Sequence, residues 1–253
     1  GEFRYLSQLD LTRTLIRAFN RSEIPLKFSQ GFHPMPDLSF GPALPLGVEG
    51  CEEWLDFCAL VDCDPEQLLR QLNAHMSTEL RFTSLQKIPT KSAALFQAID
   101  TATYVIGVGH EAIAHAARER LDGDESSEAE LHQRLVDRLL AREEISATVK
   151  RKGKERRIDI RPLIKSIEVV NGDRPLGLRV IVGAGASGNL RPEVLLKELY
   201  GDAPVEWQIT REGLYVQTDE GLLRPVDLSL FAPAAAVDLE RSPDAAPVDG
   251  AHP

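Results

Sequence analysis

The spacing of apolar residues switches between helical and strand periods along the chain, and the order of these switches constrains the fold most. Ser7 followed by Asp10 has the pattern of a helix N-cap, and apolar residues at helical spacing come after it. Strand-like alternation and a second capped helix follow. In order, the expected elements are a helix over 10–21, strands over 38–40 and 53–61, a helix from Asp64, and a strand over 80–88.

The same order of elements returns after residue 98. The expected elements are a strand over 104–108, a helix over 131–140, an extended stretch over 148–160, a strand over 178–182, a helix from Pro192 to Gly201, and a strand over 207–216. An extended entry or strand followed by helix, strand, strand, helix and strand is the split βαβ order of a ferredoxin-like sandwich. We therefore predict an α+β chain of tandem ferredoxin-like (βαββαβ) sandwiches.

The predicted sandwiches set the domain boundaries. We place one ferredoxin-like domain over residues 1–90, with a Gly/Pro-rich loop, and a second over 99–226, with a basic ribbon. Residues 231–253 consist mainly of Ala, Pro and Asp and hold little to bury, so we expect a disordered C-terminal tail.

Composition and charge limit the classes of function. The chain has 29 basic and 39 acidic residues, a net charge of −10, which argues against indiscriminate binding to polyanions. Its three cysteines form no C-x-x-C pair and no metal-ligating motif is present, so we expect no metal and no cofactor in this chain. No membrane-spanning stretch and no secretory signal is found, so we expect no membrane contact and a cytoplasmic protein.

A Gly/Pro-rich segment over residues 28–36 is the densest candidate site. Glycines permit unusual backbone angles and prolines fix the turns, so we expect a stiff loop that presents Ser29, Gln30 and His33 for recognition. The alternative is an ordered crossover whose polar groups only satisfy neighbouring backbone. His33 is a candidate general base, although the sequence identifies no partner for it.

A second candidate site is basic. Seven of the twelve residues from Lys150 to Arg161 are cationic, and we expect an extended ribbon or hairpin that turns at Gly153. Such a ribbon can follow a phosphate backbone, with salt-dependent affinity. The alternatives are a solvated edge strand protected by its charges and, for Asp159, a local ion pair with Arg161.

Residues 183–189 are rich in glycine and lead into the helix at Pro192, where backbone N–H groups and the positive helix end favour an anion. The segment lacks the Lys-Ser/Thr ending of a P-loop, and a flexible strand-to-helix turn is the alternative. With Arg13 and Arg17 on the polar side of the first helix, the candidate binding residues are Asp10, Arg13, Arg17, Ser29, Gln30, His33, Ser39, Lys150, Arg151, Lys152, Arg157, Asp159, Arg161, Asn189 and Arg191.

Several blocks of sequence resemble one known family. The blocks are Arg-Tyr-Leu-Ser-Gln-Leu-Asp-Leu over 4–11, Ser-Gln-Gly-Phe-His-Pro over 29–34, Ser-Phe at 39–40, Ala-Leu-Pro-Leu-Gly over 43–47, Asp-Ile-Arg-Pro over 159–162, and Gly-Asn-Leu-Arg-Pro-Glu over 188–193. In this order they resemble the radical SAM-linked domain of unknown function, over most of the chain to about residue 226. That family occurs alone or C-terminal to cobalamin-binding radical SAM domains, and its activity is not assigned.

The resemblance implies a partner rather than a reaction. The partner is expected to be a radical SAM protein, fused or docked, that uses S-adenosylmethionine, an iron–sulfur cluster and optionally cobalamin. Members commonly carry a basic strand ahead of the first block, so we expect that strand to be truncated or supplied by a preceding domain. Members often have His where Gln8 stands here, which argues against a catalytic role at that position.

We favour a substrate-recognition domain for RNA that works with a radical SAM enzyme and has no catalysis of its own. Under this hypothesis the Gly/Pro-rich loop and the basic ribbon converge on one surface. One alternative is a metal-independent endoribonuclease resembling CRISPR repeat-processing enzymes, with His33 as the base. The other alternative is a protein-interaction scaffold in which the loop contacts the core of the partner.

Overall fold

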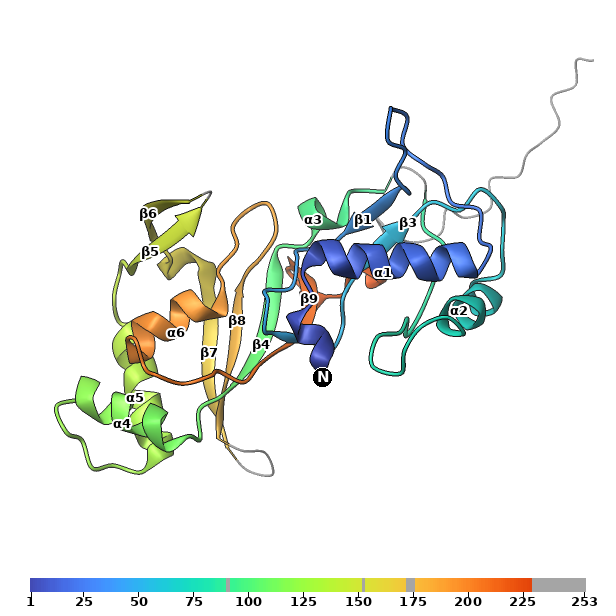
Figure 1. Cartoon of the computed structure of the whole chain (residues 1–253). Helices are drawn as coiled ribbons and strands as arrows, with labels where there is room; N and C mark the ends of the chain where they lie inside the picture. The colour runs from blue at the N-terminus through green and yellow to red at the C-terminus, as the bar shows by residue number, and fades with distance from the viewer. Residues whose placement is uncertain (90–91, 152, 172–175, 229–253) are drawn as a thin grey trace, which may run out of the picture.

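The chain is described by a computed structural model over residues 1–89, 92–151, 153–171 and 176–228, and it is a mixed α+β protein (Figure 1). The helices are α1 (Gln8–Arg21), α2 (Pro65–Asn73), α3 (Leu95–Ala98), α4 (Glu111–Arg120), α5 (Glu128–Leu140) and α6 (Pro192–Tyr200). The strands are β1 (Leu38–Phe40), β2 (Glu49–Gly50), β3 (Leu55–Phe57), β4 (Thr101–Gly107), β5 (Ser146–Arg151), β6 (Lys154–Asp159), β7 (Ile164–Val170), β8 (Gly177–Gly183), β9 (Ile209–Thr218) and β10 (Gly221–Leu223). Short 3-10 helices lie at Glu2–Tyr5, Arg161–Leu163 and Pro225–Asp227.

The second half of the chain, residues 95–228, is built on one sheet whose five main strands are antiparallel. Its strand order is β10-β9-β4-β8-β7, and β2 joins it by pairing in parallel with β9. Figure 1 shows α4, α5 and α6 on the side of this sheet that faces away from α1. The central order β9-β4-β8-β7, with helices between β4 and β7 and between β8 and β9, is that of a single βαββαβ unit.

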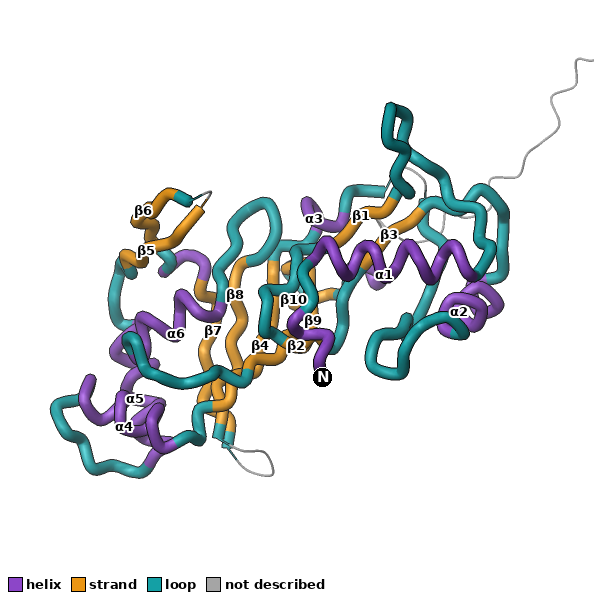
Figure 2. The backbone as a smooth tube through the Cα atoms, in the orientation of Figure 1, coloured by secondary structure: helices purple, strands orange, loops and turns teal. Residues whose placement is uncertain are grey.

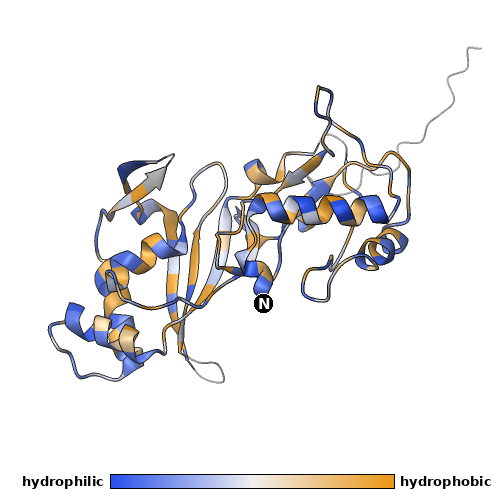
Figure 3. Cartoon of the chain, in the orientation of Figure 1, coloured by the Kyte–Doolittle hydropathy of each residue, from blue (hydrophilic) through white to orange (hydrophobic). Residues whose placement is uncertain are grey.

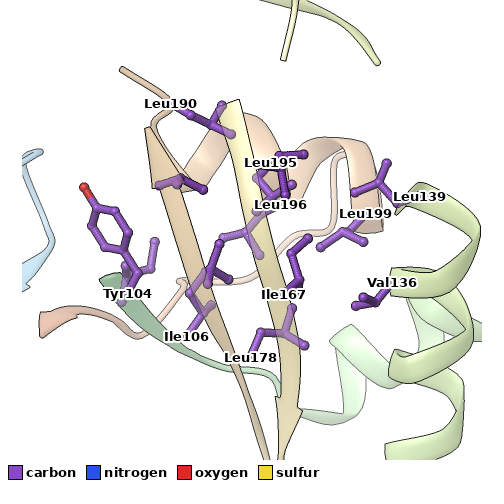
Figure 4. Packing of buried hydrophobic residues seen from close by; sticks show 14 of the residues in the cluster. Tyr104, Ile106, Val136, Leu139, Ile167, Leu178, Leu190, Leu195, Leu196 and Leu199 are labelled. Carbon is purple, nitrogen blue, oxygen red and sulfur yellow. The ribbon is translucent and has the colours of Figure 1, made fainter. Parts of the chain in front are cut away.

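Local sequence explains the helices of this half. The second of its long helices, α5, begins with a reciprocal capping box between Ser127 and Glu130. Helix α6 has Pro192 at its first position and ends at Gly201, whose φ of 69° few other residues adopt. The inward side chains of α5 and α6 then meet the apolar face of the sheet (Figure 4). Each fully buried Leu or Ile in this core contributes about 1.5–3 kcal/mol.

The first half, residues 1–89, departs from the prediction. β1 and β3 form a sheet of two strands, covered by α1 and α2 around a small core of Phe19, Ile24, Leu26, Leu68 and Leu72. The predicted strand over 80–88 is wrong, because this segment has no regular secondary structure and pairs with no strand in the described part of the chain. Figure 2 shows the stretch between α2 and α3 as loop. A second complete sandwich is therefore not found among the residues that the structure describes, and the tandem ferredoxin-like arrangement is not confirmed.

Several predicted elements agree with the structure. The Ser7 hydroxyl accepts the Asp10 amide at 3.2 Å, so it caps α1, and the Asp64 carboxylate accepts the Gln67 amide at 3.0 Å at the start of α2. β5 and β6 form the expected hairpin, with Gly153 at a φ of 75°. Residues 231–253, predicted to be a disordered tail, lie outside the described residues. Within the described residues no helix is both long and apolar enough to cross a bilayer.

Candidate functional site

Residues 28–36, called here the projecting loop, stand out from the first half next to β1 (Figure 1). The Ser29 amide donates to the Met35 carbonyl at 2.8 Å, and the Met35 amide donates to the Ser29 hydroxyl at 3.1 Å. The Asp37 amide donates to the Lys27 carbonyl at 2.8 Å, closing the base of the loop. Ser29 therefore holds the loop in shape, which is the structural alternative to its expected role in binding.

The tip of the projecting loop faces solvent. Gln30 and His33 are exposed, and neither forms a hydrogen bond or ion pair with another described residue. Phe32 between them is fully exposed, and Phe28 and Met35 are also largely exposed. The loop thus presents an apolar tip with two free polar side chains. Because no described side chain orients His33, the geometry lacks the base–orienter pair of an acid–base site.

The polar residues expected on α1 contact one another. Asp10 accepts the Ser7 hydroxyl at 2.7 Å and pairs with Arg13 at 3.4 Å, while Arg17 donates to the Thr14 hydroxyl at 3.0 Å. Both arginines are exposed, and solvent-exposed pairs of this kind contribute little to stability. Arg13 and Arg17 therefore stay accessible to a ligand at small cost. Ser39 lies in β1 opposite Asp56 rather than on the projecting loop.

β5 and β6 form a separate two-stranded sheet, called here the basic hairpin, which is attached beside α6 (Figure 1). Lys154, Arg156 and Arg157 of β6 are exposed, and no carboxylate of the described residues pairs with them. Figure 3 colours most of β6 hydrophilic. Of Lys150 and Arg151 only the backbone is described, and Lys152 lies outside the described residues.

Asp159 and Arg161 form hydrogen bonds with the backbone at the end of the basic hairpin. The Asp159 carboxylate accepts the Ile145 and Arg161 amides, both at 2.9 Å. The Arg161 side chain donates to the Ile164 carbonyl at 3.5 Å, and the side-chain ion pair weighed for these two residues is not found among the described contacts. Asp159 is therefore a turn-stabilising residue, because its acceptor oxygen is committed to backbone N–H groups.

The glycine-rich segment before α6 packs against protein. The Ala184 amide donates to the Asp100 carbonyl at 2.9 Å, and the Ala186 amide to the Phe96 carbonyl at 3.2 Å. Gly185 has a φ of 77°, and a Cβ there would lie 2.1 Å from the Ile99 carbonyl oxygen. The segment needs glycine for a close approach to α3, and two of the N–H groups that an anion cradle would use are taken. Asn189 and Arg191, which follow it, are exposed.

The structure does not bring the candidate residues to one surface. Figure 1 shows the projecting loop in the first half beyond β1 and the basic hairpin in the second half beyond β7. The expected convergence of the two is replaced by two separate surfaces. The reason is topological, since β7 and β9 are opposite neighbours of the β4–β8 pair, the hairpin precedes β7, and the first half attaches at β9.

The structure also reveals a buried ion pair that the sequence analysis missed. Arg211 of β9 is 1% exposed; its Nε donates to Glu53 Oε1 at 2.8 Å, and its Nη2 bonds both Glu53 Oε2 and the Pro42 carbonyl. Burial by itself lowers the pKa of Arg211, but the Glu53 carboxylate outweighs it and raises the pKa. The available signal was that Arg211 shares the inward face of the predicted strand with Ile209, because a charge on a buried face needs a partner.

The first 192 residues match a family model described as "Uncharacterized protein conserved in bacteria (DUF2344)". No curated protein matches the chain.

Proposed function

The chain belongs to this family of uncharacterized proteins conserved in bacteria, and we propose that it is a recognition domain for RNA in the cytoplasm. In this role it presents the RNA to a radical SAM enzyme that is fused to it or docks alongside. The enzyme carries the chemistry with its own S-adenosylmethionine, iron–sulfur cluster and, optionally, cobalamin. The chain itself contributes binding surfaces.

The uncompensated charge of the basic hairpin carries the proposal. Lys154, Arg156 and Arg157 are exposed without a carboxylate partner among the described residues, in a chain whose net charge is −10. Unpaired cations on a narrow ribbon favour a polyanion that approaches the ribbon alone, while the acidic remainder of the molecule repels nonspecific contacts. A phosphate backbone has the opposite charge, and a cluster of exposed cations is the usual electrostatic footprint of a nucleic-acid site.

The projecting loop supplies the second surface, toward the enzyme. Phe28, Phe32 and Met35 expose apolar surface on a loop whose base is closed by backbone hydrogen bonds. Exposed aromatic and methionine side chains are enriched where one protein contacts another. Two surfaces that lie apart suit a domain that holds RNA at one end and an enzyme at the other.

A salt titration of RNA binding tests the proposal. We expect the full chain to bind single-stranded RNA, and the double variant Arg156→Ala/Arg157→Ala to reduce the slope of log affinity against log salt by about 1.4, since each phosphate contact adds about 0.7 for a single strand. The matched control is Arg21→Ala/Arg81→Ala, which removes two exposed arginines of the first half and leaves the slope unchanged. Equal slopes in the two double variants would show that the basic hairpin is not part of the RNA-binding surface.

The same preparation separates recognition from cleavage. RNA incubated with the chain in a chelator stays intact under this proposal. Cleavage that is lost in His33→Ala would instead make the chain a metal-independent endoribonuclease, with His33 as its base. His75→Ala is the matched control, because His75 is also exposed.

A further inference from the structure

A small cavity opens in the second half of the chain, where the ends of three helices meet. α4, α5 and α6 pack against one another (Figure 1), and residues of all three line a cavity of about 390 Å³. Small-molecule sites hold about 300–1,000 Å³, so this volume suits a small ligand. Its floor is apolar and consists of the buried side chains of Leu135, Leu139 and Leu199.

Three arginines form the rim of the cavity. Arg120 is the last residue of α4, Arg138 lies in the last turn of α5, and Arg142 follows α5, all with exposed side chains. Among the described residues, Glu198 of α6 is the one carboxylate that lines the cavity. Three guanidinium groups and one carboxylate leave two positive charges in excess. The three helix ends add about half a negative charge each, which still leaves a positive excess.

Backbone hydrogen bonds hold two of these arginines in place. Arg138 Nη1 donates to the Arg120 carbonyl at 2.8 Å, and Arg120 Nη2 donates to the Glu198 carbonyl at 2.9 Å. These carbonyls lie at helix ends, where the helix itself supplies no partner. A guanidinium carries five N–H donors, so most donors of both side chains remain without a partner in the described part of the chain. The two side chains are therefore positioned and still able to bind a ligand.

Arg142 is bound more loosely. Its Nη1 lies 3.8 Å from Glu198 Oε2, which is longer than a hydrogen bond. No hydrogen bond of the Arg142 side chain is found within the described residues. Exposed pairs of this kind contribute little to stability, so Arg142 can turn to a ligand at small cost. Glu198 is the group that opposes an anion in the cavity.

We infer that this cavity binds a phosphate monoester. The planar fork of a guanidinium group matches phosphate oxygens in pairs. A monoester carries a charge of about −1.5 to −2 at pH 7, close to the excess of the rim, whereas a diester inside an RNA chain carries only one negative charge. The concave shape favours the same choice, because a terminal phosphate can enter a cavity and an internal phosphate is flanked by chain on both sides.

Two sources share this chemistry, the phosphorylated end of an RNA and a free mononucleotide. Arg142 lies four residues ahead of β5, and α6 contacts β5, so the cavity is near the base of the basic hairpin. An RNA whose end occupies the cavity can therefore continue along the hairpin. That source rests on the proposed function, while binding of the monoester does not.

Titration with a mononucleotide tests the cavity. We expect the full chain to bind 5′-AMP, and to bind 3′,5′-cyclic AMP at least about fivefold more weakly, because the cyclic nucleotide has the same base but only a diester. Arg142→Gln removes one charge without breaking a hydrogen bond, and should weaken binding of 5′-AMP at least about fivefold. The matched control is Arg134→Gln, an exposed arginine of α5 that pairs with Asp124 outside the cavity and should leave the affinity unchanged.

Glu198→Gln should have the opposite effect. It removes the carboxylate of the rim, so binding of 5′-AMP should become tighter. If the arginines serve only the helix ends, neither Arg142→Gln nor Glu198→Gln changes the affinity, and that result overturns the inference. Urea unfolding of each variant verifies that it is folded.

A single-stranded RNA with a 5′-phosphate or a 5′-hydroxyl identifies the source. If the RNA end occupies the cavity, the phosphate strengthens binding at least about fivefold, and Arg142→Gln abolishes this gain. Binding of 5′-AMP without such a gain identifies a free nucleotide. Arg156→Ala/Arg157→Ala should leave 5′-AMP binding unchanged, so a failure of the hairpin as an RNA surface is distinguished from a failure of the cavity. If the protein binds no 5′-AMP and the 5′-phosphate adds nothing to RNA binding, the inference is overturned.

Discussion

At the scale of single residues, His132 is the most sharply constrained titratable group. It is wholly buried in α5, with Nδ1 2.9 Å from the Tyr200 hydroxyl of α6, and its Nε2 has no partner among the described residues. Burial lowers the pKa of His132 to about 4. The imidazole is thus neutral in the folded chain at physiological pH, and it links two helices through one hydrogen bond.

His132 should make stability depend on pH. An unfolded histidine has a pKa of about 6.5, so acid protonates the unfolded chain before the folded one. The contribution is complete above pH 6.5 and is lost as the pH falls toward 4, by about 3 kcal/mol in total. Denaturant unfolding at a series of pH values measures it. In His132→Leu, the free energy of unfolding should be lower overall and should no longer fall between pH 6.5 and 4. The exposed control His75→Gln should keep this fall. A profile unchanged in His132→Leu would contradict the assignment.

At the scale of elements, the contact between α3 and the segment before α6 depends on one glycine. Gly185 combines a left-handed φ of 77° with a Cβ position 2.1 Å from the Ile99 carbonyl oxygen. Either feature alone disfavours a side chain, and together they require glycine. The contact holds this segment against the end of α3 and the residue before β4, which explains why it is a packing loop.

Substitution at Gly185 separates backbone strain from steric overlap. Gly185→Ala should destabilise the chain by at least about 3 kcal/mol, because strain and overlap add. Gly123→Ala is the matched control: Gly123 has a φ of 83° and no atom within 4 Å of its Cβ position, so strain alone should cost about 1–2 kcal/mol. Thermal and urea unfolding measure both variants. Equal losses would show that the overlap is relieved by a small shift of the loop.

At the scale of the whole molecule, one buried ion pair ties the two halves together. Glu53 and Arg211 are 158 positions apart, and the same arginine donates to the Pro42 and Ala43 carbonyls at 2.9 and 3.3 Å. β2 adds to the same strand by parallel pairing. Residues 42 and 43, which follow β1, are therefore held against the sheet of the second half. The first half has a small core of its own, so this attachment contributes much of its order.

Removing one partner of the Glu53–Arg211 pair should destabilise the chain more than replacing both partners with apolar residues. Arg211→Met leaves Glu53 partly buried without its partner, and should destabilise the chain by about 3 kcal/mol. Arg211→Met/Glu53→Leu should recover part of this loss, since no unpaired charge remains. Lys197→Met, which breaks the exposed pair with Asp202, is the control and should have little effect. Equal losses in the single and double Arg211 variants would mean that the carbonyl contacts dominate.

Elements whose signals lie within a turn or two of chain could be read from the sequence. The Ser7 and Asp64 caps, the Pro192 start and Gly201 end of α6, and the alternation of β9 act over at most a few residues, so local patterns predict them. The prediction of a strand over 80–88 was wrong because strand formation depends on a distant partner, not on local pattern. A strand exists only when a partner pairs with it, and the described chain offers none at that edge.

For the candidate site, the sequence by itself determined which residues carry charge and which segments are stiff, since both properties belong to the residues. The exposure of Arg156 and Arg157 follows from their density in one hairpin. Only the tertiary structure decided that the projecting loop and the basic hairpin lie apart, and that Arg211 meets Glu53. These relations depend on strand order and on contacts between distant segments, which are set by the packing of the whole chain and have no signature in local spacing.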